Sequence, residues 1–462
     1  MTATAATASP PLDTPPLPWS AIPEPPSGPL GHTPAWLGYD NARTVLQRLQ
    51  SYAACGPLAR VRVGPVRMLF VSDPALAGEV LSAPEANYKG AVYILTRVVL
   101  DNVLLLNGEA WARYRKAYRG ALRNVAPRGV AREVTARFTD GLLSSTSAGA
   151  GPVQLDRATN RLVRDIVGGF VAGVTLPDEL EPHRHRVQYE LAAVGIDLQC
   201  QPWAFLSPRR WIALRQSVAA LRAVFREAVR ERLARPNDRP DILNGFIQLA
   251  RAGEYPLDIN ALQEGIVNFF FSATDVLAST AGWTTWLLAT HAAEQERLRT
   301  ALANGPAELD DNEYLGQVTK EALRLYPGYS LFGRTTQADM VIGGYEVPKG
   351  TMLLFSPFVT HRLERYWPEA ERFQPERWSG RALGAPPPAV RDQFLPFGSG
   401  LRGCLAAHLA TPLLKEIVAG IIPRARLRAV AGHRPEIVYW GTTFSANGLP
   451  ATITGISQPF SK

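Results

Sequence analysis

The alternation of apolar and polar residues along the chain predicts several helices and a smaller number of short strands. Between residues 155 and 255, apolar residues recur at helical spacing, which indicates a series of amphipathic helices. A single long helical pattern then runs from Asn260 to His291 with few helix-breaking residues. The breaks within residues 155–255 are expected at prolines, namely Pro177, Pro202, Pro208 and Pro236.

Strands are expected in two places. In residues 54–81, polar and apolar side chains alternate and the spacing then becomes helical, so two short strands should lead into a helix. After Pro327, the stretch MVIGGYEVPKGTMLLFS predicts further short strands. Helical periodicity returns in LAAHLATPLLKEIVAGII, directly after Cys404.

Composition narrows the class of protein. The chain has 462 residues, a formal net charge of +8 and three cysteines, too few for a disulfide framework, which fits a reducing compartment. No basic tail accompanies the charge, so nucleic-acid binding is not expected. Residues 1–30 are rich in proline and small residues and contain no apolar run long enough to cross a bilayer. We therefore expect a flexible lead-in and a cytoplasmic protein without a membrane anchor.

The run FGSGLRGC, which ends at Cys404, carries the clearest chemical signal. A cysteine that binds a metal must stay deprotonated, and backbone N–H groups stabilise its sulfur anion. Because a helical pattern follows Cys404, the helix N-terminus should favour the thiolate. Arg402 is placed to bind an anionic group such as a haem propionate. Gly398, Gly400 and Gly403 allow positive φ angles and a close approach of the backbone to a flat cofactor.

Three other motifs precede this run. Glu321 and Arg324 in KEALRLYP are three residues apart and therefore lie on one helix face, where they can pair. Arg377 in FQPERW can complete a network with them. Two further sites are the pair Trp111 and Arg115 in WARYR, spaced by four residues, and Arg334 in SLFGR.

Together these motifs resemble the cytochrome P450 family, whose haem-ligand signature is FxxGxRxCxG. The signature matches in register from Phe397 through Gly400 and Arg402 to Cys404, and only its last glycine is replaced, by Ala406. The Glu321 motif and the WARYR motif resemble the ExxR and WxxxR motifs of the family. Trp378 stands where the family usually has phenylalanine, at the end of PERF.

The resemblance implies a mainly α-helical fold with a small β-rich lobe, formed as one domain over residues 31–462. It implies a haem b cofactor whose iron is bound by the thiolate of Cys404, and a structural network of Glu321, Arg324 and Arg377. The other haem contacts that it implies are Phe397, Gly398, Arg402, Trp111, Arg115 and Arg334.

The long helix departs from the family at the oxygen-activating segment. The family has an acid followed by threonine, in a sequence like AGxDT, and the corresponding residues here are SATDV, with Asp275 as the acid and Val276 at the alcohol position. Valine has the shape of threonine but neither donor nor acceptor, so it cannot order a proton-donating water. Ser272 lies on roughly the same helix face and offers a substitute hydroxyl, whereas Thr274 points elsewhere.

Three interpretations follow from this departure. In the first, the protein is a monooxygenase in which a substrate hydroxyl, or a water held by Asp275 or Ser272, completes proton delivery. In the second, it acts without dioxygen on a substrate with a weak N–O or O–O bond, by nitrene-like transfer, cyclisation, rearrangement or dehydration. In the third, it binds haem without catalysis.

The resemblance also places the substrate and an electron donor. The substrate pocket is expected to be apolar and to suit a lipophilic small molecule, such as a secondary metabolite. Its expected lining is Tyr93, Ile94, Val98, Phe269, Ala273, Val276, Leu331 and Phe332. An acidic, ferredoxin-type electron donor is expected to bind a basic stripe on the helix that contains Trp111. The alternative interpretation of this stripe is a solvated helix face. The stripe consists of Arg113, Lys116, Arg119 and Arg123.

The segment EPHRHR contains His183 and His185, which are separated by one residue. A metal-binding pair is one interpretation of this spacing. A solvated loop beside a proline is the interpretation that we favour.

Overall fold

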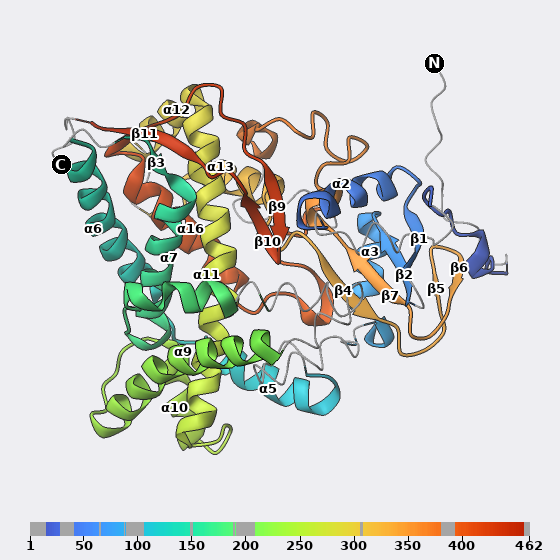
Figure 1. The fold of residues 1–462 in the computed structure, drawn as a ribbon, viewed down its shortest axis with the longest axis horizontal. Helices are drawn as coiled ribbons and strands as arrows, with labels where there is room; N and C mark the ends of the chain where they lie inside the picture. Colours follow the sequence, from blue (N-terminus) through green and yellow to red (C-terminus); the bar gives the residue numbers. More distant parts are fainter. Residues whose placement is uncertain are drawn as a thin grey trace.

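The computed structural model describes residues 15–27, 41–63, 66–86, 88, 106–147, 151–187, 190, 208–304, 308–379 and 393–456. Most helices gather into a large lobe, and the strands β1, β2, β4 and β7 lie in a smaller lobe beside it (Figure 1). The mainly helical fold with a β-rich lobe is therefore confirmed. The larger helices are α5 (Gly108–Ala121), α6 (Pro127–Ser147), α7 (Leu155–Ala172), α9 (Pro208–Ala234), α10 (Ile242–Arg251), α11 (Ile259–Thr290), α12 (Ala292–Asn304), α13 (Glu313–Leu325) and α16 (Ala407–Ile421).

The small lobe is built on a four-stranded sheet with the order β1-β2-β7-β4. Strands β1 (Leu58–Val63) and β2 (Val66–Val71) form the predicted hairpin, and α3 (Pro74–Ser82) follows them. Strand β7 (Met352–Phe355) runs parallel to β2, and β4 (Phe332–Thr335) pairs antiparallel with β7. The sheet therefore joins the N-terminal strands to the segment that follows α13. Helix α2 (Asn41–Ala53) packs on this lobe.

The remaining strands form three smaller sheets. They are the pair β5 (Met340–Ile342) and β6 (Tyr345–Val347), the pair β9 (Ile437–Trp440) and β10 (Thr442–Ser445), and the sheet of β3 (Val153–Gln154), β11 (Pro450–Gly455) and β8 (Ala425–Ala429). The short helices are η1 (Trp19–Ala21), η2 (Pro84–Ala86), η4 (Asp178–Leu180), α14 (Pro357–Thr360), η6 (Pro375–Trp378) and η7 (Gly400–Arg402).

Helix α11 is the axis of the large lobe and crosses it from end to end in Figure 1. It begins at Asp258, whose carboxylate accepts hydrogen bonds from the backbone N–H groups of Asn260 and Ala261. It confirms the long helix predicted from the sequence. Polar residues on its buried faces satisfy their hydroxyl groups locally, since Thr274 and Thr284 each donate to the carbonyl four residues earlier.

The N-terminal lead-in differs from the prediction in part. Residues 15–27 lie against the small lobe, where Leu17 bridges to Tyr345 and Ile22 is buried. Burial of an apolar side chain offsets the entropy lost by ordering this segment, so these residues are not a flexible tail.

Candidate functional site

Cys404 lies just before α16, whose first residue is Ala407. Its backbone N–H donates to the carbonyl of Phe397 at 3.0 Å, which closes the loop formed by residues 397–404. The residue is exposed, yet the protein atoms around its sulfur raise the pKa of the thiol by desolvation. Backbone N–H groups of Ala406 and Ala407 point to the sulfur and oppose that rise, as does the charge of Arg115. The predicted position of the cysteine before a helix N-terminus is confirmed.

The turn before Cys404 requires glycine at two positions. Gly398 and Gly400 both have φ +67°, a left-handed conformation that favours glycine. A Cβ atom at Gly400 would lie 1.9 Å from the carbonyl oxygen of Leu81 in α3, so the backbone of the loop contacts the small lobe directly. Gly403 does not use this freedom, because it follows η7 with an ordinary φ of −55°.

Arg115 and Trp111 of α5 contact the loop, and Arg402 of the loop reaches back to α5 and the residues before it. Arg115 donates to the carbonyl of Gly403 at 2.8 Å, and its guanidinium carbon lies 5.4 Å from the centre of the Trp111 ring. The guanidinium carbon of Arg402 lies 4.6 Å from the same ring centre. Arg402 also donates to the carbonyl of Leu106 and to the side chain of Asn107, at 2.8 and 2.9 Å.

The site concentrates positive charge. The pKa of Arg402 is lowered to about 10, first by burial and then by the charges of Arg334 and Arg115. Arg334 comes from β4, where its side chain is buried and its guanidinium donates to the carbonyl of Gly333 at 2.8 Å. Three guanidinium groups from three separate elements therefore repel one another around the cysteine loop. Such an arrangement suits a ligand that carries carboxylates.

Glu321 and Arg324 form a fully buried ion pair on α13. Arg324 donates to both carboxylate oxygens of Glu321, at 2.9 and 2.8 Å, and Arg377 donates to one of them at 2.9 Å. The remaining guanidinium donors of Arg324 reach backbone carbonyls, including those of His361 and Ala370 at 2.8 and 2.6 Å. The structure thus brings the three expected residues together and fastens the chain segment after α14 to α13.

Trp378 explains one departure from the family motif. Its indole N–H donates to Glu321 Oε2 at 2.9 Å, and its side chain is buried. Phenylalanine has no such donor. We did not anticipate this bond from the sequence, although the tryptophan at the end of PERW was the signal for it.

His361 links this network to the cysteine loop. Nδ1 lies 3.1 Å from the carbonyl of Arg324, to which it donates, and Nε2 accepts from the backbone N–H of Leu395 at 2.9 Å. Both nitrogen atoms are therefore used by a neutral ring. Burial, followed by the charge of Arg324, lowers the pKa of His361 to about 3.

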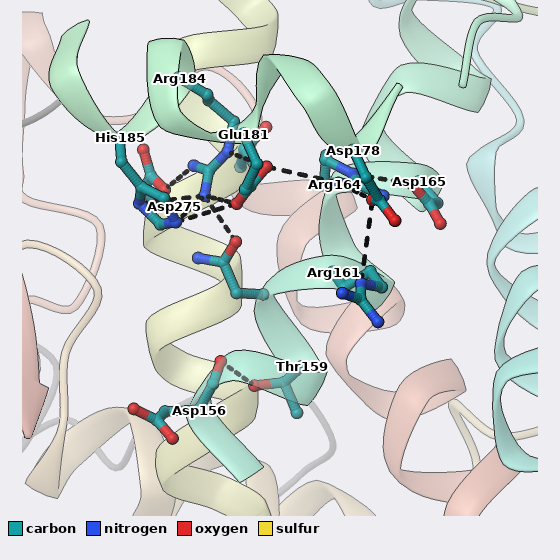
Figure 2. A network of polar contacts seen from close by, with 12 residues as sticks. Asp156, Thr159, Arg161, Arg164, Asp165, Asp178, Glu181, Arg184, His185 and Asp275 are labelled. Carbon is teal, nitrogen blue, oxygen red and sulfur yellow. Dashed lines mark hydrogen bonds and ion pairs between the residues drawn. The ribbon is translucent and has the colours of Figure 1, made fainter. Parts of the chain in front are cut away.

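Asp275 of α11 is buried and contacts Arg184 (Figure 2). Residues 181–187 are helical, and Arg184 is completely buried, so the expectation of a solvated loop at EPHRHR was wrong. The apolar sequence of α11 leaves Asp275 in a buried place, which a paired arginine makes tolerable. Burial raises the pKa of Asp275, and the charge of Arg184 opposes this rise.

The alcohol position of α11 has a different neighbour. A Cβ atom added to Gly328 would lie 2.3 Å from Cγ1 of Val276. The backbone of the loop after α13 therefore packs directly against the valine side chain. The Ser272 side chain is exposed, and its hydroxyl donates to the carbonyl of Asn268. Thr280, one turn after Val276, donates to the Val276 carbonyl at 3.0 Å. The sequence analysis did not consider Thr280. Its position four residues after Val276, on the same helix face, was the signal that could have identified it.

The expected pocket residues divide into three groups. Ala273, Val276 and Phe332 are partly exposed. Phe269 and Leu331 are instead used in packing, because Phe269 stacks on Tyr118 with ring centres 5.0 Å apart and Leu331 belongs to the small-lobe core. Tyr93, Ile94 and Val98 lie outside the described residues.

The basic stripe on α5 has the predicted phase. Arg113, Lys116 and Arg119 are exposed, while Tyr118 on the opposite face is buried. Arg123 is exposed just beyond the end of the helix. Lys116 approaches Glu254 at 3.3 Å. The stripe therefore remains a largely accessible positive surface next to the helix that covers the cysteine loop.

The residues present fit a haem with a thiolate ligand. Backbone N–H groups point to the sulfur of Cys404, and the guanidinium groups of Arg115, Arg334 and Arg402 would bind the propionates. In the part of the chain that the structure describes, no helix is both long enough and apolar enough to cross a membrane.

Comparisons with known proteins identify the family. The family model for Cytochrome P450 matches residues 23–447. The chain is 31% identical over 443 residues to Cyclooctat-9-en-7-ol 5-monooxygenase of Streptomyces melanosporofaciens, covering 90% of this chain and 92% of that protein. It is 27% identical over 427 residues to Zealexin A1 synthase of Zea mays, covering 86% and 83%. With its cysteine loop, arginine cluster and buried Glu321 network, the chain belongs to the cytochrome P450 family and uses that family's haem-thiolate cofactor.

Proposed function

We propose that the protein is a monooxygenase that acts on a lipophilic small molecule of the terpenoid type. The observation that carries this proposal is the geometry at Cys404, where a sulfur served by two N–H groups lies among three arginines. The similarity over nine tenths of the chain to Cyclooctat-9-en-7-ol 5-monooxygenase, whose name specifies an alcohol as its substrate, supports the substrate class. When bound, the haem supplies the activation of dioxygen.

The residues of α11 then divide the work. Asp275 is the acid that holds a proton near the reacting centre, because its burial favours the neutral carboxyl. Val276 excludes water next to the loop at Gly328 and offers no hydroxyl. The hydroxyl hydrogen of Ser272 is directed to the Asn268 carbonyl, so Ser272 acts as an acceptor. A hydroxyl of the substrate, or a water that it orders, completes the proton path.

Electrons enter by way of an acidic, ferredoxin-type donor at the basic stripe of α5. Arg113, Arg119 and Arg123 are exposed, and the same helix carries Trp111 and Arg115 against the cysteine loop. Long-range attraction between opposite charges accelerates such encounters and weakens with salt. Charge reversal at Arg113 and Arg119 should slow reduction by the donor most at low ionic strength and leave the bound cofactor spectrum unchanged.

A second function is favoured by the hydroxyl groups of α11. Val276 has none, and the hydroxyl of Ser272 donates to the backbone carbonyl of Asn268. In this alternative, the protein converts a substrate that already contains an N–O or O–O bond, and no dioxygen is consumed. The Val276→Thr variant separates the two. It should raise the fraction of electrons that ends in product under the monooxygenase proposal and change little under the alternative.

The decisive experiment compares turnover on terpenoid alcohols with and without oxygen. The reduced enzyme must first give the carbon monoxide difference band of a thiolate-bound haem. Incorporation of one labelled oxygen atom, with strict dependence on an electron donor, is the expected result. Product formation without oxygen and reductant would support the second function, and a missing thiolate band would overturn both.

A further inference from the structure

A cavity of about 510 Å³ lies between α7, α11, β10 and residues 178–185. On α11 it is lined by Ala278, Ser279 and Gly282, whereas the side chain of Val276 packs on the loop after α13. At about 100° per residue, these two sets lie on different faces of the helix. The volume falls in the range of small-molecule pockets. The cavity can therefore hold a ligand apart from the pocket expected for the substrate.

Helix α7 presents arginine side chains to this cavity. Arg157, Arg161 and Arg164 line it and follow one another at spacings of four and three residues, so they share one helix face. Arg164 is already matched, because it donates to Asp165 and Asp178 at 3.0 and 2.8 Å. Arg161 approaches Asp178 only to 3.9 Å. The guanidinium of Arg157 has neither an ion pair nor a hydrogen bond with any residue that the structure describes.

The carboxylates that line the cavity compensate these two arginines poorly. Glu181 is taken by Arg184, at 2.6 and 3.1 Å, and by His185 at 3.0 Å. Asp156 accepts a backbone N–H at 3.3 Å, and Figure 2 shows its carboxylate directed away from Arg161. Two guanidinium groups of α7 thus remain for an anion. A carboxylate suits them, because guanidinium groups bind it through two parallel hydrogen bonds.

Thr443 of β10 provides an independent observation on another wall. It lines the cavity and is completely buried, and its hydroxyl oxygen has no hydrogen-bond partner within the described residues. The Thr443 carbonyl accepts from Ser279 at 2.6 Å and from the indole N–H of Trp283 at 3.0 Å, which holds the strand against α11. Buried hydroxyl groups are nearly always hydrogen-bonded in native proteins. An oxygen atom of a ligand would supply the partner that Thr443 lacks.

The remaining wall is largely apolar. Ala278 and Trp283 of α11, Phe444 of β10 and Leu449 contribute to it. An inorganic anion would leave this surface and most of the volume unused. A molecule with an apolar body fills both and gains the free energy of burying its own apolar surface.

We infer that this cavity is a second ligand site, which binds an organic acid with an apolar body and a further oxygen-bearing group. Arg157 and Arg161 bind the carboxylate, the apolar wall encloses the body, and Thr443 pairs with the second oxygen. The site goes beyond the proposed monooxygenase activity, because none of these residues touches the cysteine loop or the face of α11 that carries Val276.

A rigid probe with two polar ends tests the site. In 6-hydroxynaphthalene-2-carboxylate, the carboxylate and the hydroxyl stand at opposite ends of an apolar ring system. Its binding to the ferric holoenzyme is measured by equilibrium dialysis at neutral pH and low ionic strength. An excess of 4-phenylimidazole, which binds haem iron, keeps the probe out of the substrate pocket. We expect about one probe molecule per chain to bind while the spectrum of the imidazole-bound haem stays unchanged.

Charge variants test the carboxylate end. Arg157→Gln and Arg161→Gln should each weaken binding about tenfold, because each removes a charge-assisted hydrogen bond. Asp156→Asn removes the nearest poorly matched carboxylate and should strengthen binding about threefold. Arg137→Gln is the matched control, since it removes an exposed arginine of α6 that pairs only with Glu133 of the same helix, and should leave binding unchanged.

The isosteric variant Thr443→Val tests the other end. It should weaken binding of the hydroxylated probe about fivefold and leave binding of naphthalene-2-carboxylate, which has no hydroxyl, unchanged. Equal losses for the two probes would overturn the role of Thr443.

No binding in the presence of 4-phenylimidazole, or equal affinities in the parent, Arg157→Gln and Arg161→Gln, would overturn the site itself. The dialysis needs neither oxygen nor an electron donor. Its outcome is therefore independent of the oxygen-incorporation experiment, and the two failures are distinguishable.

Discussion

Two buried carboxylates, Glu321 and Asp275, sit in very different surroundings. Glu321 accepts hydrogen bonds from Arg324, Arg377, Trp378 and a backbone N–H, at 2.8 to 3.0 Å. Asp275, within the described residues, accepts from a guanidinium that it must share with Glu181. A saturated carboxylate holds chain segments in place, whereas an under-compensated one can exchange a proton. From this contrast we propose a structural role for Glu321 and a chemical role for Asp275.

The largest effect is expected at the cysteine loop that the Glu321 network supports. Cys404→Ala removes the thiolate, so the reduced carbon monoxide spectrum should lose its thiolate band completely. Cys55→Ala, which changes the other described cysteine, serves as the matched control and should leave the band unchanged. Persistence of the band in Cys404→Ala would contradict the site.

Glu321→Gln tests the saturated acid. Removing its charge leaves two guanidinium groups without their counter-charge in a buried place, which should cost about 3–5 kcal/mol in the free energy of unfolding. The measurement is denaturant unfolding of the holoenzyme. The control is Glu369→Gln, which breaks a solvent-exposed pair with Arg372 and should leave the free energy of unfolding nearly unchanged. Equal effects of the two variants would remove the contrast drawn above.

Acid should weaken the link between the network and the cysteine loop. The folded chain holds the pKa of His361 at about 3, below its ordinary 6.5. Between pH 6.5 and pH 3, the unfolded chain therefore binds a proton that the folded chain does not. Stability should therefore fall by roughly 4 kcal/mol on this account as the pH drops from about 6.5 to 3. Unfolding free energies of the parent and of His361→Asn, compared across this range, measure it. Parallel pH curves would show that His361 does not contribute.

Trp378→Phe restores the residue usual in the family and removes one of the bonds to Glu321. Because the other donors remain, we expect a loss of only about 1–2 kcal/mol in the free energy of unfolding. Thermal unfolding of the holoenzyme at constant pH provides the measurement. A gain in stability would mean that the indole N–H is not a useful donor there.

The smallest effect on stability is expected at the other acid. Asp275→Asn makes the same carboxylate-to-amide change as Glu321→Gln, but Arg184 retains Glu181 and Asn160. The free energy of unfolding should change by less than about 1 kcal/mol, while product coupling falls. A stability loss as large as that of Glu321→Gln would assign Asp275 a structural role.

The sequence predicted the contacts of the Glu321 network far better than those of Asp275. Glu321, Arg324 and Arg377 belong to motifs whose spacing fixes the helix face, and Cys404 is followed by an obvious helix, so their contacts could be predicted. The partner of Asp275 could not be, because Arg184 lies 91 residues away and its segment resembled a solvated loop. Periodicity gives the phase of a helix but not the neighbour that covers each face.

The same limit accounts for the pocket residues. Phe269 lies on roughly the same face of α11 as Ser272 and Val276. Tyr118 of α5 nevertheless stacks on its ring and covers it. Leu331 follows Ser330 in an apolar loop, but the small lobe encloses both of them. In each case, tertiary packing decided which apolar residue faces a ligand and which one fills the core.

The absence of a side chain at Gly400 has a mechanical consequence. The Leu81 carbonyl of α3 occupies the space where a Cβ atom would be, so the turn that carries the sulfur rests directly on a helix more than 300 positions earlier in the chain. A change in α3 that shifts this helix would displace the iron ligand as well. The colour of the cofactor would then report on the integrity of the N-terminal lobe.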